Sequence, residues 1–440
     1  MQHIHRSRLL ALFQDQPENI LFLKGGRTTH RYNTDFEYPF RQESNFLYLT
    51  GIHEPDMSAI IHCGTGEYVL VIPRRDARFA VWMGYVRTSD EYMDTYQPDR
   101  VIYNDELSGW LKKARPGTVH CLPGTEAEIT QYGLSPDTGH LADALAWCRV
   151  IKTEYEINQM KMAAAVACQA HLEVMKATAP GAFEYEMKAV FDFHATRHGQ
   201  VHAPYSGIFA SGPGSAILHY TEKHRMLEDG ELFLVDAGTE YHGYASDITR
   251  TYPVNGRFSS LQADLYDIVL NAQTTALNMM RPGIKMEDVH LASAATIVSG
   301  LRDLQLVKGN VDELMDQNIF ALFFPHGLGH FLGLDTHDVG GYPKGTEKID
   351  RPGLRFLRAR RTFEPGMALT IEPGLYFIPA LLEPALADSK TAGYLHKSRL
   401  KKLFDFGGIR IEDNVLIRED GIENLTSVPK TRQELELVLG

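Results

Sequence analysis

The sequence is poor in the features that mark several classes of protein. It has only 4 cysteines among 440 residues and no C-x-x-C pair, which argues against a disulfide scaffold or a zinc ribbon. No apolar run approaches the ~20 residues that a membrane span requires. The apolar stretch Leu9–Phe13 is too short for the hydrophobic region of a signal peptide. We therefore predict a cytoplasmic protein with reduced thiols.

Positive charge and nucleotide-binding motifs are also scarce. The chain has 44 Lys and Arg against 56 Asp and Glu, a formal net charge of −12, so no broad basic field is available for nucleic acid or an anionic membrane. No G-x-x-x-x-G-K-[ST] loop occurs, and Gly212-Pro-Gly214 lacks the third glycine of a dinucleotide loop. The composition, 44% hydrophobic and 23% charged, is that of an ordinary globular protein.

The length and the turn signals predict more than one domain. At roughly 150 residues per domain, 440 residues correspond to two or three. Residues 57–73 alternate apolar strands around a turn at Gly64–Gly66, which indicates a hairpin. Thr153–Glu156 is a capping box that starts a long helix. We predict an α/β domain over residues 1–150 and a second domain over residues 151–440.

The second domain shows one pattern twice. Two helices separated by a Pro-Gly pair precede strands, first with a helix to about Thr178 and one ending at Gly199. The pattern returns with a helix to Met280 and one from about Met286 to Leu301. The strands expected after these helix pairs are Glu231–Gly238 with Tyr244–Tyr252, and Ala368–Gly374 with Gly408–Leu416. The order predicts an α+β domain built from two structurally related halves.

Four acidic residues lie inside these apolar strands, where an uncompensated buried carboxylate would be very costly. The segment Phe323–His330 adds candidate histidines. Four carboxylates contribute −4 and two divalent cations +4, so a bridging hydroxide leaves the site near −1. This charge count predicts a two-metal hydrolase. The four acids are Asp236, Asp247, Glu372 and Glu412.

The residues around these acids match a known set of motifs: Val-Asp236-Ala-Gly, Ser-Asp247-Ile-Thr-Arg-Thr, Pro-His-Gly-Leu-Gly-His330, Thr-Ile-Glu372-Pro-Gly and Gly-Ile-Arg-Ile-Glu412-Asp. In order and context they resemble the "pita-bread" metallopeptidases, which include methionine aminopeptidase, aminopeptidase P, Xaa-Pro dipeptidase (prolidase) and creatinase relatives. The resemblance implies a curved antiparallel sheet with pseudo-twofold halves. The stretch Arg41–Gly51 looks like the N-terminal domain of aminopeptidase P and prolidase.

Two branches of this family remain in competition. Pro343–Arg361 and the stretch from Tyr376 to Gly408 look like prolidase, whereas His219–Glu222 and Asp247–Gly256 resemble aminopeptidase P. The balance favours an Xaa-Pro dipeptidase, with an aminopeptidase acting on longer peptides as the alternative. A non-catalytic relative would have lost ligands, and all five are present here.

The resemblance also implies roles for the ligands. Asp247 and Glu412 would bridge two ions, Asp236 would complete one ion, and His330 with Glu372 would complete the other. Glu372 would also shuttle protons. Oxygen ligands with a single imidazole favour a hard or borderline ion such as Mn²⁺. We therefore expect two divalent ions per chain.

Other residues are expected to serve the substrate. His219 and His337 match the family's active-site histidines; one would stabilise the gem-diolate and the other orient the substrate, without an assignment of which does which. Arg358 would bind the substrate carboxylate through its planar fork. His326 is open between loop scaffold and substrate contact. Arg410 and Tyr205 are further substrate-binding candidates.

The expected assembly is a homodimer, with a tetramer as the alternative. Trp82 can reach a partner subunit's site, although a lone tryptophan more often belongs to a core.

Overall fold

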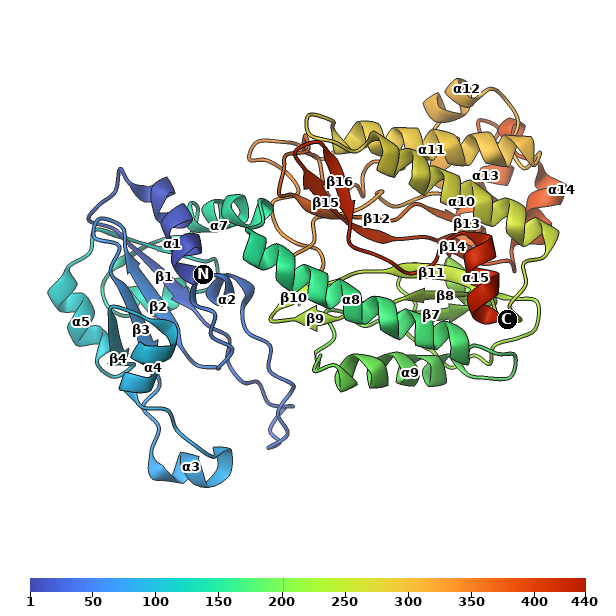
Figure 1. Ribbon diagram of the computed structural model, residues 1–440. Helices are drawn as coiled ribbons and strands as arrows, with labels where there is room; N and C mark the ends of the chain where they lie inside the picture. Colours follow the sequence, from blue (N-terminus) through green and yellow to red (C-terminus); the bar gives the residue numbers. More distant parts are fainter. Residues whose placement is uncertain (201) are drawn as a thin grey trace. The chain divides into compact units, whose positions relative to one another are not determined.

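The computed structural model describes residues 1–200 and 202–440 and divides the chain into two compact units, Met1–Arg149 and Val150–Gly440 (Figure 1). No helix within the described part of the chain is long and apolar enough to cross a membrane. The four cysteines are all buried and form no disulfide with one another.

The first unit is a mixed α/β layer, as predicted. Its six-stranded sheet has the order β4-β3-β2-β1-β5-β6, and the expected hairpin is the antiparallel pair of β2 and β3. The strands are β1 (Ile20–Lys24), β2 (Ser58–His62), β3 (Tyr68–Ile72), β4 (Arg100–Tyr103), β5 (Thr118–Cys121) and β6 (Ser135–Asp137). The helices are α1 (Gln2–Leu10), α2 (Ser44–Thr50), α3 (Ala77–Met83), α4 (Ser89–Tyr96), α5 (Leu107–Ala114), α6 (Glu126–Thr130) and α7 (Leu141–Val150).

Helix α3 projects away from this sheet and buries none of its side chains (Figure 1). Trp82, on this helix, is 85% exposed. Trp82 is therefore not the core residue that a lone tryptophan usually is.

The second unit contains the two predicted helix pairs. Helix α8 (Glu154–Ala177) begins at the Thr153 capping box, where the Glu156 carboxylate accepts from the Thr153 N–H at 2.8 Å. Helix α9 (Glu184–Arg197) follows, and α10 (Ser260–Met279) and α11 (Met286–Asp303) form the second pair. The strands lie between the α8–α9 pair and the α10–α11 pair (Figure 1). Smaller helices are α12 (Val311–Asp316), α13 (Pro379–Ala387), α14 (Lys397–Leu400) and α15 (Arg432–Leu439).

Each half contributes a three-stranded sheet. The first, in the order β11-β8-β7, joins β7 (Ile208–Ser211), β8 (Leu232–Asp236) and β11 (Thr249–Pro253). Between β8 and β11 in the sequence, β9 (Glu240–Tyr241) and β10 (Tyr244–Ala245) form a separate short pair. The second, in the order β12-β15-β16, joins β12 (Ala368–Ile371), β15 (Asp413–Arg418) and β16 (Gly421–Asn424). An antiparallel bridge between Thr249 and Glu412 links the two sheets.

The strands of the second half are interrupted where the sequence predicted continuous ones. Residues 368–374 and 408–416 do pair, but as β12 with β15 and as β13 (Gly374–Tyr376) with β14 (Gly408–Arg410). Pro373 has no N–H to give to a ladder, so it interrupts the pairing. Glu372 and Glu412 lie at the two opposed interruptions.

Candidate metal centre

Two of the acidic residues lie at the same end of the first sheet. Asp236 ends β8 and pairs in register with Thr249, while Asp247 lies two residues before β11. Burial and the nearby Asp236 carboxylate raise the pKa of Asp247 above its usual range. Its Oδ1 atom is buried and has no hydrogen-bond partner among the described residues. A buried carboxylate oxygen without a partner is costly, which indicates a place that suits a cation.

His330 is held in the form that a metal requires. Its Nδ1–H donates to the Phe331 carbonyl at 3.0 Å, so the lone pair is on Nε2. Nε2 lies 3.4 Å from Asp247 Oδ2 and also 3.4 Å from Glu372 Oε1. Burial alone would lower the pKa of His330, but these two carboxylates raise it. A backbone bond that fixes the tautomer is typical of a metal-ligating histidine.

Glu372 and Glu412 complete the set from the second half. Burial and the Asp247 carboxylate raise the pKa of both, that of Glu372 to about 7. Thr370 Oγ1 donates to Glu372 at 3.2 Å, and Thr249 Oγ1 donates to Glu412 at 2.5 Å. These hydroxyls orient the two carboxylates toward the same space.

The donor set fits a divalent cation. One ligand atom each from Asp247, His330 and Glu412 lies within 4.8 Å of the others. Two bonds of about 2.1 Å from one ion place their ligand atoms about 3 Å or more apart, which is the separation found between His330 and its two carboxylates. Carboxylates that repel one another and share one neutral imidazole suit a hard or borderline ion.

A second group of possible ligands lies in the first unit, but its distances differ. His120 Nδ1 and His140 Nδ1 approach Asp137 Oδ2 to 2.6 and 2.7 Å. These are hydrogen-bond lengths, shorter than two ligands of one ion would allow. Burial opposes ionisation of Asp137, yet the hydrogen bonds from His140, Gly139 and His120 lower its pKa to about 2. This group is a hydrogen-bonded cluster.

Arg410 and Tyr205 contact a ligand. Arg410 Nη2 and the Tyr205 hydroxyl each donate to Asp236, both at 2.7 Å. Arg410 also donates to Thr249 Oγ1 at 3.2 Å and to the Tyr376 hydroxyl at 2.8 Å. The Arg410 side chain is 5% exposed. These contacts of Arg410 and Tyr205 orient Asp236.

His326 lies next to Glu372, with Nδ1 3.9 Å from Oε2. Nδ1–H donates to the Gly327 carbonyl at 2.8 Å, so Nε2 accepts from the Tyr376 hydroxyl at 2.9 Å. Burial and the Arg410 charge lower the pKa of His326 to about 3, which keeps the ring neutral. Both ring nitrogens are thus engaged within the protein.

The three remaining candidates, His219, His337 and Arg358, are exposed. His337 stacks edge-on against the His330 ring, with centroids 4.3 Å apart. Desolvation, together with the neighbouring His330, Arg358 and His219, lowers the pKa of His337 to about 3. All three residues therefore lie within electrostatic range of the same site.

Comparison of the chain with known protein families identifies the family to which it belongs. Residues 158–419, more than half of the chain, match "Metallopeptidase family M24". The chain belongs to metallopeptidase family M24. Residues 3–120 match "Aminopeptidase P, N-terminal domain". This match confirms the resemblance that was predicted from Arg41–Gly51.

Relatives in this family come from both branches. Xaa-Pro dipeptidase from Homo sapiens is 38% identical, with 98% of this chain and 92% of that protein covered. A probable Xaa-Pro aminopeptidase from Coccidioides posadasii is also 38% identical, with 100% and 96% covered. The structure of Escherichia coli aminopeptidase P with the inhibitor Pro-Leu has a TM-score of 0.85 and 33% identity, covering 100% of this chain and 98% of that one.

Thr249, Thr370 and Tyr376 were not predicted from the sequence. The two threonine hydroxyls donate to the candidate ligands Glu412 and Glu372, and the Tyr376 hydroxyl contacts Arg410 and His326. The signal was present for the threonines, because each lies two positions from an acid on an extended segment and shares its face. Tyr376 could be found only from the fold, since its partners are distant in sequence.

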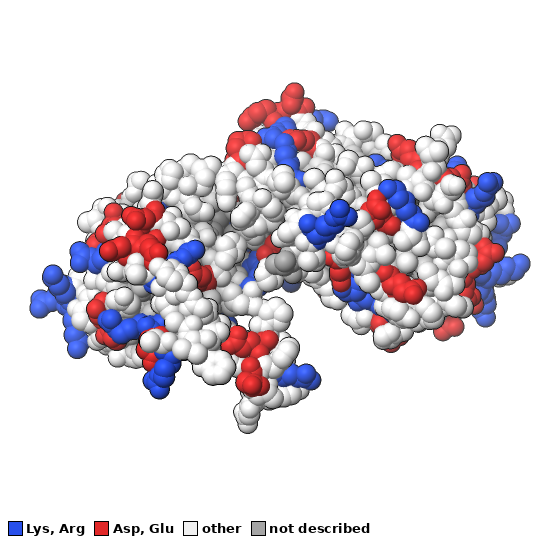
Figure 2. All heavy atoms as spheres, turned by 60° about the horizontal axis from the view of Figure 1, so that its bottom comes forward, with Lys and Arg blue, Asp and Glu red and all other residues white. Residues whose placement is uncertain are grey.

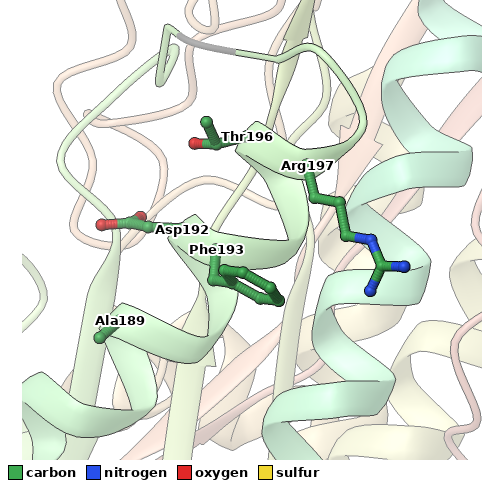
Figure 3. A pocket seen from close by; sticks show the side chains of 5 residues that line it. All are labelled: Ala189, Asp192, Phe193, Thr196 and Arg197. Atoms are coloured by element: carbon green, nitrogen blue, oxygen red, sulfur yellow. The ribbon is translucent and has the colours of Figure 1, made fainter.

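A hollow elsewhere on the surface has no part in this site. It lies along α9 and is lined by Ala189, Asp192, Phe193, Thr196 and Arg197 (Figure 3). None of these residues is a ligand or substrate candidate.

Proposed function

We propose that this M24 metallopeptidase is an Xaa-Pro dipeptidase that uses two divalent cations. The observation that carries the metal centre is the buried, unpartnered Oδ1 of Asp247, a residue that has one ligand atom within 4.8 Å of ligand atoms of His330 and Glu412. The dipeptide specificity is supported by the likeness to mammalian Xaa-Pro dipeptidases over nearly the whole chain.

In this proposal the two cations would be held by Asp236, Asp247, His330, Glu372 and Glu412, with Asp247 and Glu412 as the shared ligands, Asp236 completing one ion, and His330 with Glu372 completing the other. When bound, the cations would acidify a water and polarise the scissile carbonyl. Glu372 would be the group that accepts and returns a proton. The leaving prolyl nitrogen has no N–H of its own and requires that proton.

The surrounding residues then bind and orient the peptide. Desolvation and nearby positive charge lower the pKa of His337 to about 3. Its ring is therefore neutral and can donate a hydrogen bond from one nitrogen. We propose that His219 and His337 hold the reacting carbonyl and the peptide. Arg410 and Tyr205 act on the substrate through Asp236, which both contact. His326 supports this arrangement through Tyr376.

Arg358 is the proposed contact for the prolyl carboxylate. It is exposed yet close enough to lower the pKa of His337. Losing a charge-assisted hydrogen-bonded pair costs about 1.5–3 kcal/mol, so Arg358→Ala should lower kcat/KM for Xaa-Pro roughly 10- to 150-fold. Arg358→Lys should recover only part, because an ammonium cannot bind both oxygens.

The test is a cycle of enzyme variant against substrate terminus. Amidation of Xaa-Pro should cost the wild type heavily and Arg358→Ala little, because the partner is already missing. Arg355→Ala is the matched control, since Arg355 is exposed in the same loop and pairs with Asp350 at 3.1 Å. Additive effects of the variant and of amidation would place the carboxylate contact elsewhere.

The second candidate function is an aminopeptidase for longer peptides that have proline second. The fold likeness to aminopeptidase P structures over the whole chain favours it. Hydrolysis of Xaa-Pro and Xaa-Pro-Yaa, measured side by side, separates the two. A wild type that is indifferent to amidation and prefers the tripeptide is an aminopeptidase.

We also propose Mn²⁺ as the metal, a homodimer as the assembly and the cytoplasm as the location. The oxygen-rich donor set supports Mn²⁺. The exposed apolar surface of α3 supports a dimer, because Val81 is 78% and Trp82 85% exposed. The four buried thiols without a disulfide support a reducing compartment. Acidic and basic side chains are interspersed over the surface in Figure 2, in keeping with a peptide rather than a nucleic-acid substrate.

A further inference from the structure

His219 lies on a long connection that needs an anchor. The segment from Gly212 to Glu231 joins β7 to β8 and contains no strand, and His219 itself is exposed. An exposed histidine on such a segment would sample many positions unless the rest of the segment were fixed. If His219 serves the proposed peptidase, something must fix it.

One buried carboxylate, from a residue outside this segment, forms hydrogen bonds with it. Glu184, the first residue of α9, is 0% exposed, and fully buried glutamates are rare unless paired. Its Oε1 accepts from the Ser211 N–H and hydroxyl, both at 2.8 Å. Its Oε2 accepts from the Tyr220 hydroxyl at 2.8 Å and from the Arg225 N–H at 3.1 Å.

The positions of these donors are the informative feature. Ser211 ends β7 immediately before the segment, Tyr220 follows His219 directly, and Arg225 comes after both. The Arg225 guanidinium closes the same ring, donating to the Ser211 carbonyl at 2.6 Å and to Glu231 at 2.8 Å. The backbone N–H of Glu184 donates to the Arg225 carbonyl at 3.0 Å. The carboxylate therefore holds Ser211 just before the segment, Arg225 within it, and Tyr220, the neighbour of His219.

We propose that Glu184 is a positioning residue that sets the place of His219 in the active site. It acts through Ser211, Tyr220 and Arg225 and does not itself touch substrate. This inference rests on the proposed peptidase function and adds a residue to it. A glutamine cannot replace Glu184, because one of its two terminal atoms is a donor and would face donors.

The test is a double-mutant cycle between Glu184→Gln and His219→Ala, measured as steady-state hydrolysis of Xaa-Pro by the metal-loaded enzyme. Glu184→Gln should lower kcat/KM by about tenfold, the cost of a lost hydrogen bond to a charged group. It should change the same parameter, kcat or KM, that His219→Ala changes. In the His219→Ala background it should cost less than about twofold, because its target is gone.

The controls separate positioning from general damage. Glu186→Gln, at an exposed capping residue on the same helix, should leave activity unchanged. Tyr220→Phe removes one of the four donors, and the same cycle with it decides the matter if Glu184→Gln does not fold. Equal losses in both backgrounds would overturn the proposal, as would wild-type activity in Glu184→Gln. A wild type without Xaa-Pro hydrolysis would instead refute the proposed function.

Discussion

Arg250 is a fully buried cation behind the metal-ligand strands, and its removal is the sharpest test of how the centre is supported. Its side chain is 0% exposed, as is that of Asp413, with which it pairs at 2.8 Å. Its other N–H groups donate to backbone carbonyls, and two of those carbonyls belong to Thr249 and Glu412. The remaining two are those of Val428 and Pro429.

The magnitude follows from what Arg250→Met would leave behind. Breaking a buried ion pair by removing one partner costs about 3–5 kcal/mol. Lys430 would still face Asp413 from 2.5 Å, so the loss should lie near the lower limit. Burial opposes ionisation of Asp413, but Arg250 and Lys430 together hold its pKa below the usual range. About 3 kcal/mol corresponds to a fall in Tm of roughly 5 °C for a unit as large as Val150–Gly440.

The assay is thermal and urea unfolding of the metal-free protein, followed by metal content after reloading. Arg432→Met is the matched control, because Arg432 pairs with Asp267 at 2.8 Å while both side chains are about 40% exposed. Such a pair is worth less than about 1 kcal/mol. We also expect weaker metal retention in Arg250→Met, since its guanidinium holds the carbonyl of Glu412. A loss no larger than that of the control would refute the reasoning.

Three further predictions concern the metals. The chelated protein should be inactive and recover with Mn²⁺ at two ions per chain, measured by elemental analysis; full turnover without metal would contradict a metal centre. Asp247→Asn or Glu412→Gln should lose the paired ions, because a neutral amide cannot supply a second negative oxygen, and wild-type retention would show that neither bridges. Burial and the Asp247 carboxylate raise the folded pKa of Glu372 to about 7, above its unfolded value. Stability of the metal-free protein should therefore fall as pH rises from 5 to about 8, and the Tm gain from metal should grow; a pH-independent gain would exclude this.

Much of the fold could be read from the chain because its local signals agree with one another. The Thr153–Glu156 capping box and the Pro-Gly pairs bound the long helices within a few residues of where the structure has them. The acids were conspicuous for a physical reason: a carboxylate such as Asp236 in an apolar strand requires compensation. Periodicity therefore predicted the two halves and charge singled out the four acids, whereas the full set of candidate ligands with His330 came from the resemblance to the metallopeptidases.

The supporting contacts could not be read in the same way. Glu184 looks like an ordinary first-turn acid, and only the fold brings Tyr220 and Arg225 to it. Arg250 meets Asp413 across 163 positions of sequence. The interruption of the strand at Pro373 depends on which strand pairs with it. Local propensity carries no information about that partner. Contacts of this kind arise from tertiary register, so a single sequence carries little trace of them.

Two adjacent acids show how the chain separates structure from chemistry. Glu412 and Asp413 are both buried and, as neighbours on an extended segment, point to opposite faces. On one face Arg250 and Lys430 lower the pKa of Asp413 against the effect of burial. On the other, burial and the carboxylates of Asp247 and Glu372 raise the pKa of Glu412. Asp413 is therefore compensated within the fold. Glu412 is repelled by its neighbouring carboxylates, which supports the proposal that a cation binds there. One segment thus carries an acid that stabilises the fold next to an acid that is suited to bind metal.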